Sequence, residues 1–146
     1  MWGYSGIFET LQPGGEGAGG GGSSGGMERQ SLQRLLGSPS VQLHWLEGLW
    51  GTLQVEQLGN SYFLEVGVSD AGEGFSLRGI LTDIDAGGFG FKGSFSTQVS
   101  HIAGGMNCQR PVGDYRFVVY PGGDFWRLVQ MDNPCGRATD YFDIFW

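Results

Sequence analysis

The chain has 146 residues and a net charge of −7, and it is rich in glycine (29 residues) and in aromatic residues, with five Trp, five Tyr and ten Phe. Its eight Lys and Arg residues are scattered without a basic run, so it lacks the clustered positive charge that nucleic-acid binding requires. No apolar run is long enough for a transmembrane helix, and the N-terminus lacks the charged and apolar blocks of a signal peptide. We therefore expect no nucleic acid as a partner and no insertion into a membrane.

Residues 14–26, with the sequence GGEGAGGGGSSGG, are predicted to form a flexible linker, because Gly and Ser bury too little apolar surface to offset the entropy lost on ordering. The linker ends at an internal methionine, Met27. Residues 1–13 are too short to fold alone but carry five side chains that could anchor them on another surface: Trp2, Tyr4, Ile7, Phe8 and Leu11. We interpret the chain as a ligand peptide fused to the domain that binds it; a native glycine-rich arm and an expression scar are the alternatives.

Residues 27–146 have the length of a single domain with one core. Residues 27–39 are predicted to form a short helix, because apolar side chains recur close to one face and Gly37 followed by Pro39 provides a stop. The side chains on this face are Met27, Leu32, Leu35 and Leu36.

From Val41 onward the apolar pattern changes to period two, which is typical of half-buried strands. Gly59 and Asn60 form a turn signal between two alternating segments, so residues 49–56 and 62–68 are predicted to form a hairpin. After a loop at residues 69–74, residues 75–84 and 89–96 give two further strands joined by the turn sequence DAGG.

Residues 96–112 are less regular and are predicted to be a loop with one short strand around residues 99–102. Residues 114–120 and 125–131 form another predicted hairpin around the PGGD sequence, and residues 140–146 form the last strand. Seven or eight short strands result, with core positions expected at Leu53, Leu64, Leu77, Phe91, Phe117, Leu128 and Ile144.

The fold class is therefore predicted to be all-β and mainly antiparallel, with one short N-terminal helix. Glycines inside a strand mark sharp bends or close backbone approach, and five lie inside the predicted strands: Gly51, Gly67, Gly79, Gly90 and Gly93. They favour a small, strongly curved barrel, cracked open along residues 96–112, over a sandwich. The GLWG sequence at residues 48–51 is similar to the opening of lipocalin-like barrels, but four residues do not identify a family.

Cys108 and Cys135 are the only two cysteines, and their spacing does not fit a short metal-binding motif. We expect them to form a disulfide, which would stabilise the fold by about 3 kcal/mol in the chain-entropy model. A disulfide indicates a periplasmic or secreted protein; free thiols would indicate a cytoplasmic one.

Two pairs of carboxylates and two histidines are the candidates for chemistry, but neither set fits a known arrangement of a metal site or a catalytic site. Asp83 and Asp85 enter a turn that aspartate commonly caps, and the pair Asp140 and Asp143 lacks the spacing of a Ca²⁺ loop. His44 and His101 have no accompanying nucleophile motif. We therefore expect no catalytic residues, no metal, no cofactor and no enzymatic activity.

The remaining signal is the surplus of aromatic side chains, which are enriched where proteins bind other proteins. Trp50 and Tyr120 lie on strand faces predicted to point away from the core, so they are the expected peptide-binding surface. The sequence thus favours a monomeric, non-enzymatic module that captures a short aromatic or apolar peptide of a partner protein. The alternative is a lipocalin-like carrier that holds a small apolar ligand inside its barrel.

Overall fold

The computed structural model describes residues 22–146, and the structural statements below concern this part of the chain. It begins with helix α2 (Gly22–Leu36) and continues as nine strands, with one short 3₁₀ turn (Ala103–Gly105) between β6 and β7. The strands are β1 (Ser40–Leu43), β2 (Trp50–Thr52), β3 (Gln54–Leu58), β4 (Ser61–Asp70), β5 (Glu73–Asp85), β6 (Gly88–Gln98), β7 (Cys108–Val119), β8 (Phe125–Leu128) and β9 (Phe142–Phe145). All neighbouring strands are antiparallel, which confirms the predicted fold class.

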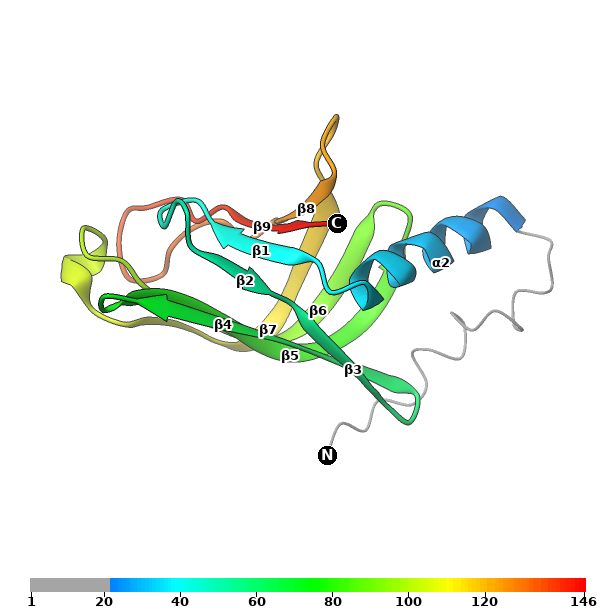
Figure 1. Cartoon of the computed structure of the whole chain (residues 1–146), viewed down its shortest axis with the longest axis horizontal. Coiled ribbons are helices and arrows are strands. Elements are labelled where there is room, and N and C mark those ends of the chain that lie inside the picture. Colours follow the sequence, from blue (N-terminus) through cyan, green and yellow to red (C-terminus); the bar gives the residue numbers. More distant parts are fainter. Residues whose placement is uncertain (1–21) are drawn as a thin grey trace.

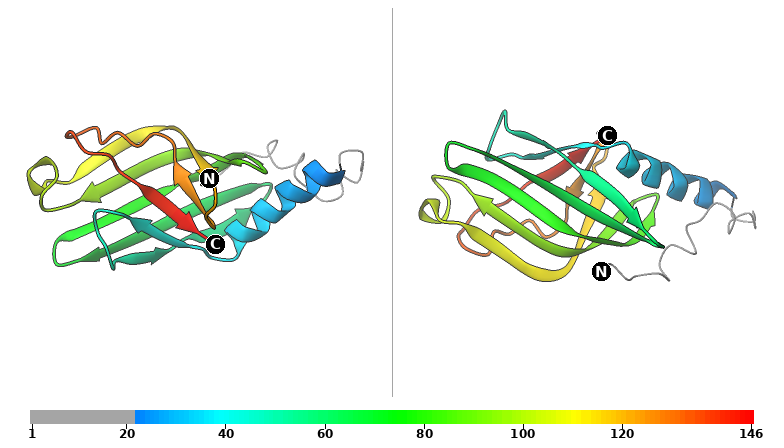
Figure 2. Two further views of the ribbon diagram at one scale, coloured as in Figure 1. Left: turned by 90° about the horizontal axis from the view of Figure 1, so that it is seen from above. Right: turned by 60° about the horizontal axis from the view of Figure 1, so that its bottom comes forward.

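The strands form a single sheet in the order β2-β1-β9-β8-β7-β6-β5-β4-β3, which curls into a nearly closed barrel (Figures 1 and 2). Its two edge strands, β2 and β3, are separated only by Leu53, so one continuous segment pairs first with β1 and then with β4. At Gly51 this segment passes so close to β4 that an added Cβ atom would lie 2.5 Å from Cγ2 of Val66. The seam of the barrel therefore lies between β2 and β4.

The predicted opening along residues 96–112 is wrong, because β6 and β7 remain paired there as far as Thr97 and Cys108. β6 runs on to Gln98, and residues 99–102 form a turn, which the 3₁₀ turn follows, in place of the expected strand. The strand count exceeds seven or eight because the segment from residue 40 to residue 58 divides into β1, β2 and β3. The two predicted hairpins are confirmed as β3–β4 and β7–β8.

The interior of the barrel is filled by side chains from alternate positions along the strands, many of them aromatic. The rings of Phe89 and Phe117 stack with centroids 5.1 Å apart, and Phe95 lies 5.1 Å from Phe142. All seven side chains predicted for the core are buried, each at most 1% exposed: Leu53, Leu64, Leu77, Phe91, Phe117, Leu128 and Ile144. The alternation in the sequence therefore identified the inner face of the sheet.

Helix α2 lies beside the turn that joins β5 to β6, at one end of the barrel (Figure 1). Leu35 is fully buried there, and the Ser31 hydroxyl donates a hydrogen bond of 3.0 Å to the carbonyl oxygen of Asp85. The helix begins at Gly22, inside the range 14–26 that the sequence assigned to the linker, and thus earlier than the predicted start at Met27. Glycine costs only about 1 kcal/mol in a helix relative to alanine, so a helix anchored at Ser31 and Leu35 can continue through it.

Candidate functional site

Four aromatic side chains form a continuous run on the outside of the barrel, from β2 across β9 and β8 to the residue that follows β7. The ring centroids are 5.3 Å apart from Trp50 to Phe145, 4.7 Å from Phe145 to Phe125 and 5.0 Å from Phe125 to Tyr120. Trp50 is 47% exposed and Tyr120 is 43% exposed. The two side chains predicted to form a surface thus lie at opposite ends of one run, and we call these four residues the outer aromatic face.

The pairing of the strands explains why these rings meet. Phe125 and Phe145 are directly opposite each other in the β8–β9 ladder. Their neighbours Trp126 and Ile144 are fully buried in the core, so the alternation of a strand turns Phe125 and Phe145 to the outside. The alternation of apolar residues in the sequence also predicts that Phe125 and Phe145 point outward. It does not predict that they are in contact, because this depends on the register between two strands that are separate in the chain.

An ion pair lies next to the rings, on the same outer surface. Nε of Arg127 lies 2.8 Å from Oδ1 of Asp143, and its NH2 lies 2.8 Å from Oδ2, so the pair is bidentate. The guanidinium also lies 4.6 Å from the ring centroid of Tyr120 and 4.2 Å from that of Tyr141. The hydrogen bond to Asp143 raises the pKa of Arg127. The arginine therefore braces the aromatic side chains and has its charge already satisfied.

His44 contacts Tyr141, the second tyrosine beside Arg127. Its Nδ1 accepts a hydrogen bond of 3.2 Å from the backbone N–H of Tyr141, and the two rings lie 4.7 Å apart. Burial lowers the pKa of His44 below its usual 6.5. His101 is exposed and contacts Trp45 edge-on at 5.5 Å. These contacts give both histidines packing roles.

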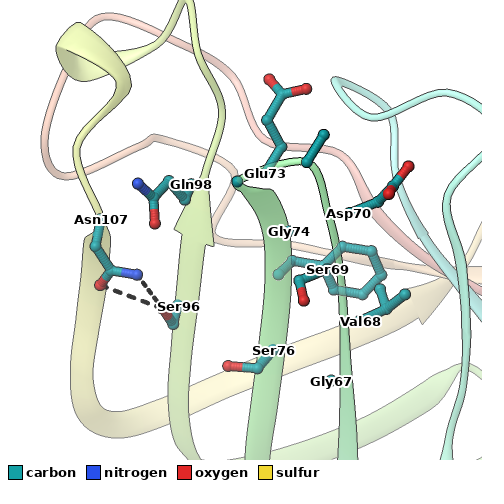
Figure 3. Close-up of a pocket in the computed structure, with 13 residues that line it drawn as sticks. Gly67, Val68, Ser69, Asp70, Glu73, Gly74, Ser76, Ser96, Gln98 and Asn107 are labelled. Atoms are coloured by element: carbon teal, nitrogen blue, oxygen red, sulfur yellow. Dashed lines mark hydrogen bonds between the residues drawn. The ribbon is translucent and has the colours of Figure 1, made fainter.

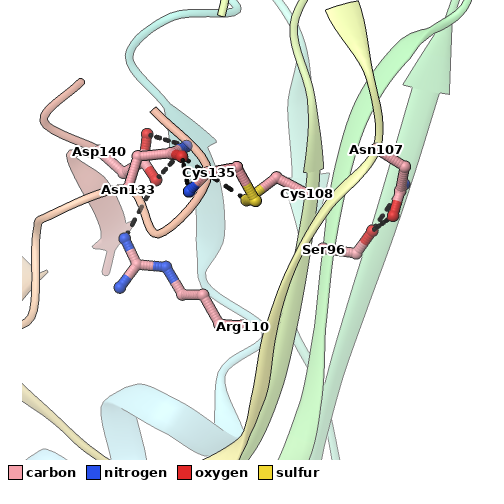
Figure 4. The surroundings of a disulfide bond; sticks show 7 residues. All are labelled: Ser96, Asn107, Cys108, Arg110, Asn133, Cys135 and Asp140. Carbon is pink, nitrogen blue, oxygen red and sulfur yellow. Dashed lines mark hydrogen bonds and ion pairs between the residues drawn. A yellow bond between two sulfur atoms is a disulfide. The ribbon is translucent and has the colours of Figure 1, made fainter. Parts of the chain in front are cut away.

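Cys108 and Cys135 form the predicted disulfide, which ties the irregular segment before β9 to β7 (Figure 4). Beside it, Arg110 and Asp140 form an ion pair of 3.0 Å, with side chains only 6% and 1% exposed. The indole N–H of Trp45 donates to Oδ1 of Asp140 at 3.1 Å. This buried cluster and the disulfide hold the segment that leads into β9, and therefore also hold the outer aromatic face.

The carboxylates considered as candidates for chemistry are each engaged with the chain itself. Asp140 and Asp143 face different arginines and do not form a pair. Asp85 accepts hydrogen bonds from the N–H groups of Gly87 and Gly88 at 2.8 and 3.0 Å, as expected of a residue that caps a turn. Asp83 and Asp85 both lie close to Arg116, at 3.6 and 3.2 Å. Within residues 22–146, no group of three or more His, Cys, Asp or Glu side chains could hold a metal ion.

A polar groove of about 700 Å³ lies on another part of the outer surface, over β4, β5 and β6 (Figure 3). Its floor is made of Gly67, Ser76 and Ser96, which are neighbours in the register of these strands. The amide of Asn107 donates a hydrogen bond of 3.0 Å to the Ser96 hydroxyl. This groove was not predicted from the sequence, although small outward residues at matching positions of three successive strands are a visible signal for it.

An apolar pocket of about 450 Å³ continues from the outer aromatic face to the end of helix α2. It is lined by Pro39, Phe145 and Trp146 together with Arg34 and the short connection between α2 and β1. The guanidinium of Arg34 lies 4.2 Å above the ring of Trp146, and that ring lies 4.5 Å from Trp126. Local sequence patterns do not predict this pocket, because its walls meet through the contact of Arg34 in α2 with Trp146, which follows β9.

The predicted peptide anchors Trp2, Tyr4, Ile7, Phe8 and Leu11 lie outside the described residues. Among the helices of the described part, none is both long and apolar enough to span a membrane.

No solved structure matches the chain. A protein of Pasteurella multocida (strain Pm70), the uncharacterized protein PM1083, is 33% identical over 113 residues, which are 77% of this chain and 73% of that protein. The model of the PM1083 family matches residues 24–146, which include the whole barrel and nearly all of helix α2. The chain is therefore a member of the PM1083 family.

Proposed function

We propose that the protein is a non-enzymatic binding module whose outer aromatic face holds a short aromatic or apolar peptide segment. The observation that carries this proposal is the continuous run of rings from Trp50 to Tyr120, with both ends more than two-fifths exposed. The fold requires apolar side chains on the inner face of the sheet but not on the outer one. Contiguous exposed aromatic side chains are typical of surfaces that bind other proteins.

The ion pair beside the rings supports an apolar ligand for this surface. Because both carboxylate oxygens of Asp143 already bind Arg127, the arginine does not need an acid from a partner. Bracing by Arg127 also limits the motion of the Tyr120 and Tyr141 rings before a ligand arrives. A surface held in its binding shape loses less entropy when it binds.

The alternative function, a carrier with an internal ligand, receives less support from the geometry. The rings of Phe89, Phe91, Phe95, Phe117 and Phe142 contact one another inside the barrel, at centroid distances from 5.1 to 6.4 Å. A ligand of useful size would have to displace several of these packed side chains. If a fluorescent apolar probe binds saturably and a peptide of residues 1–13 does not displace it, the carrier function is favoured.

The candidate ligand within the chain is the segment of residues 1–13, with the anchors named above. The family match begins at residue 24, so this segment precedes the matched residues. Residues 14–21 lie between this segment and helix α2. A Gly-rich chain of eight residues has an r.m.s. span of about 16 Å, which would raise the local concentration of a tethered ligand to the millimolar range. The disulfide further supports our proposal of a periplasmic or secreted location.

The test measures the binding of a labelled peptide of residues 1–13 to protein comprising residues 22–146, which contain the whole core. Trp50→Ala and Tyr120→Ala should each weaken binding about tenfold or more, the cost expected for an aromatic anchor. Met106→Ala is the matched control, because Met106 is a 70% exposed apolar side chain outside the aromatic face. Equal affinities of the two variants and the control would refute the proposed surface.

A further inference from the structure

We propose that the apolar pocket between helix α2 and β9 receives Phe8 of the same chain, and that Glu9 forms an ion pair with Arg34 at its rim. This inference rests on the proposed function, because it names the place where the N-terminal segment would be held. Three observations carry it: the unpaired charge of Arg34, the chemistry of the pocket walls, and the length of chain that precedes helix α2.

Arg34 differs from three arginines of the strands in its charge partners. Arg110, Arg116 and Arg127 each lie within 3.6 Å of an aspartate carboxylate. Among residues 22–146, Arg34 has no carboxylate partner, and its guanidinium instead lies over the Trp146 ring, 4.2 Å from the centroid. Stacking on a ring leaves the N–H groups at the edge of the guanidinium available. A half-buried arginine in this position favours an incoming carboxylate.

The side chains that line the pocket indicate which side chains a fitting ligand carries next to its carboxylate. Pro39, Phe145 and Trp146 make the lining mainly apolar, and Arg34 is the charged side chain among the lining residues. The fitting segment therefore has a large apolar side chain next to an acidic one. Residues 1–13 contain a single acidic residue, Glu9, and it directly follows Ile7 and Phe8. The sequence of this segment thus matches the charge and the apolar character of the pocket.

The chain is long enough for this contact. Arg34 lies twelve residues after Gly22, the first residue of α2, which corresponds to about 18 Å along a helix. Residues 10–21 provide twelve residues between Glu9 and the start of the helix, and a Gly-rich chain of that length has an r.m.s. span of about 19 Å. The segment can therefore return alongside α2 to the pocket without being stretched.

The pocket also adjoins the outer aromatic face through Phe145. An extended segment covers about 3.3 Å per residue, so Tyr4 and Trp2 would lie about 13 and 20 Å from Phe8. That distance is sufficient to follow the rings from Phe145 to Tyr120, which span two centroid steps of 4.7 and 5.0 Å. Phe8 in the pocket and Trp2 on the rings are therefore compatible positions.

The experiment uses the full chain and measures backbone order parameters of the Phe8 and Glu9 amides by ¹⁵N relaxation. In the unmodified chain we expect values near 0.85, the level of rigid backbone, and in Glu9→Arg or Arg34→Glu we expect values below about 0.6. The double variant Glu9→Arg/Arg34→Glu restores the opposite charges and should return the order parameters to the rigid level. Glu16→Arg, which makes the same charge change in the Gly-rich segment, should have no effect.

The outcomes separate this inference from the proposed function. If Phe8 and Glu9 are rigid and are released by Trp50→Ala but not by Arg34→Glu, the pocket assignment is wrong and the aromatic face remains the binding surface. If the double variant stays as mobile as the single ones, the ion pair is refuted, because reversed charges attract equally. If both amides are mobile in the unmodified chain, the docking of this segment is refuted in either place.

Discussion

The two sides of the barrel present different outer surfaces on the same kind of strand. On β8 and β9 the outward positions carry Phe125, Phe145 and the Arg127–Asp143 pair. On β4, β5 and β6 the outward positions carry Gly67, Ser76 and Ser96, which form the floor of a polar groove. Both sides have buried apolar side chains on the inner face, such as Leu64 and Leu77 on one side and Trp126 and Ile144 on the other. The inner face is thus explained by folding, whereas folding does not require the aromatic outer face, and our proposed function rests on this difference.

The largest expected effect comes from removing the disulfide that holds the aromatic side. The double variant Cys108→Ala/Cys135→Ala should lower the free energy of unfolding by about 3 kcal/mol, because the bridge restricts the unfolded chain. Amide exchange should accelerate more in β9 than in β5, since the segment before β9 is the one that the bridge ties down. Thiol titration of the denatured, unreduced protein should find no free thiol, and two reactive thiols would contradict the bridge.

The next effect concerns the ion pair beside the rings. Asp143→Ala leaves a partly buried Arg127 without its carboxylate, and the free energy of unfolding should fall by about 2 kcal/mol in chemical denaturation. Asp83→Ala removes an exposed carboxylate from Arg116 and serves as the control, with an expected loss below about 0.5 kcal/mol. Similar losses in the two variants would show that the aromatic face is not braced by this pair.

The glycines on the two sides should also respond differently to an added methyl group. Gly51→Ala places a Cβ atom 2.5 Å from Val66 at the seam, so we expect a loss of about 1 to 3 kcal/mol in thermal or chemical unfolding. Gly67→Ala places its Cβ 3.7 Å from the Cβ of Ser76, an ordinary contact, and should be tolerated. If Gly51→Ala is as stable as Gly67→Ala, β2 and β4 are not closely packed.

The smallest effect is a pH dependence that His44 contributes on the aromatic side. Desolvation lowers its pKa below 6.5, while Asp140 and Asp143 oppose and Arg127 reinforces the shift. The folded state therefore favours neutral His44, so its contribution is complete above pH 6.5 and is lost as the pH falls through the lower pKa of the folded state. His44→Asn should flatten the fall in stability below pH 6.5. An unchanged slope in His44→Asn would contradict the burial of the neutral ring.

Much of the fold could be predicted from local patterns, but the candidate site could only be predicted in part. Alternation alone placed Leu64 and Phe117 inside and Trp50 and Tyr120 outside. The contacts that join Trp50 to Tyr120 depend on the pairing of β8 with β9 and of β1 with both β2 and β9, which local patterns do not specify. The pocket at Arg34 depends on the contact of this side chain with Trp146, which is 112 residues further along the chain. Strong turn signals around residues 100–105 concealed the pairing of β6 with β7 as far as Thr97 and Cys108.

The most direct test of the account is a map of amide shifts in ¹⁵N-labelled protein of residues 22–146 during titration with a peptide of residues 1–13. We predict progressive shifts at Trp50, Phe125 and Phe145, with the amides of Gly67, Ser76 and Ser96 unchanged. Shifts confined to the polar groove, or no shifts at millimolar peptide, would contradict the claim that the outer aromatic face is the binding surface.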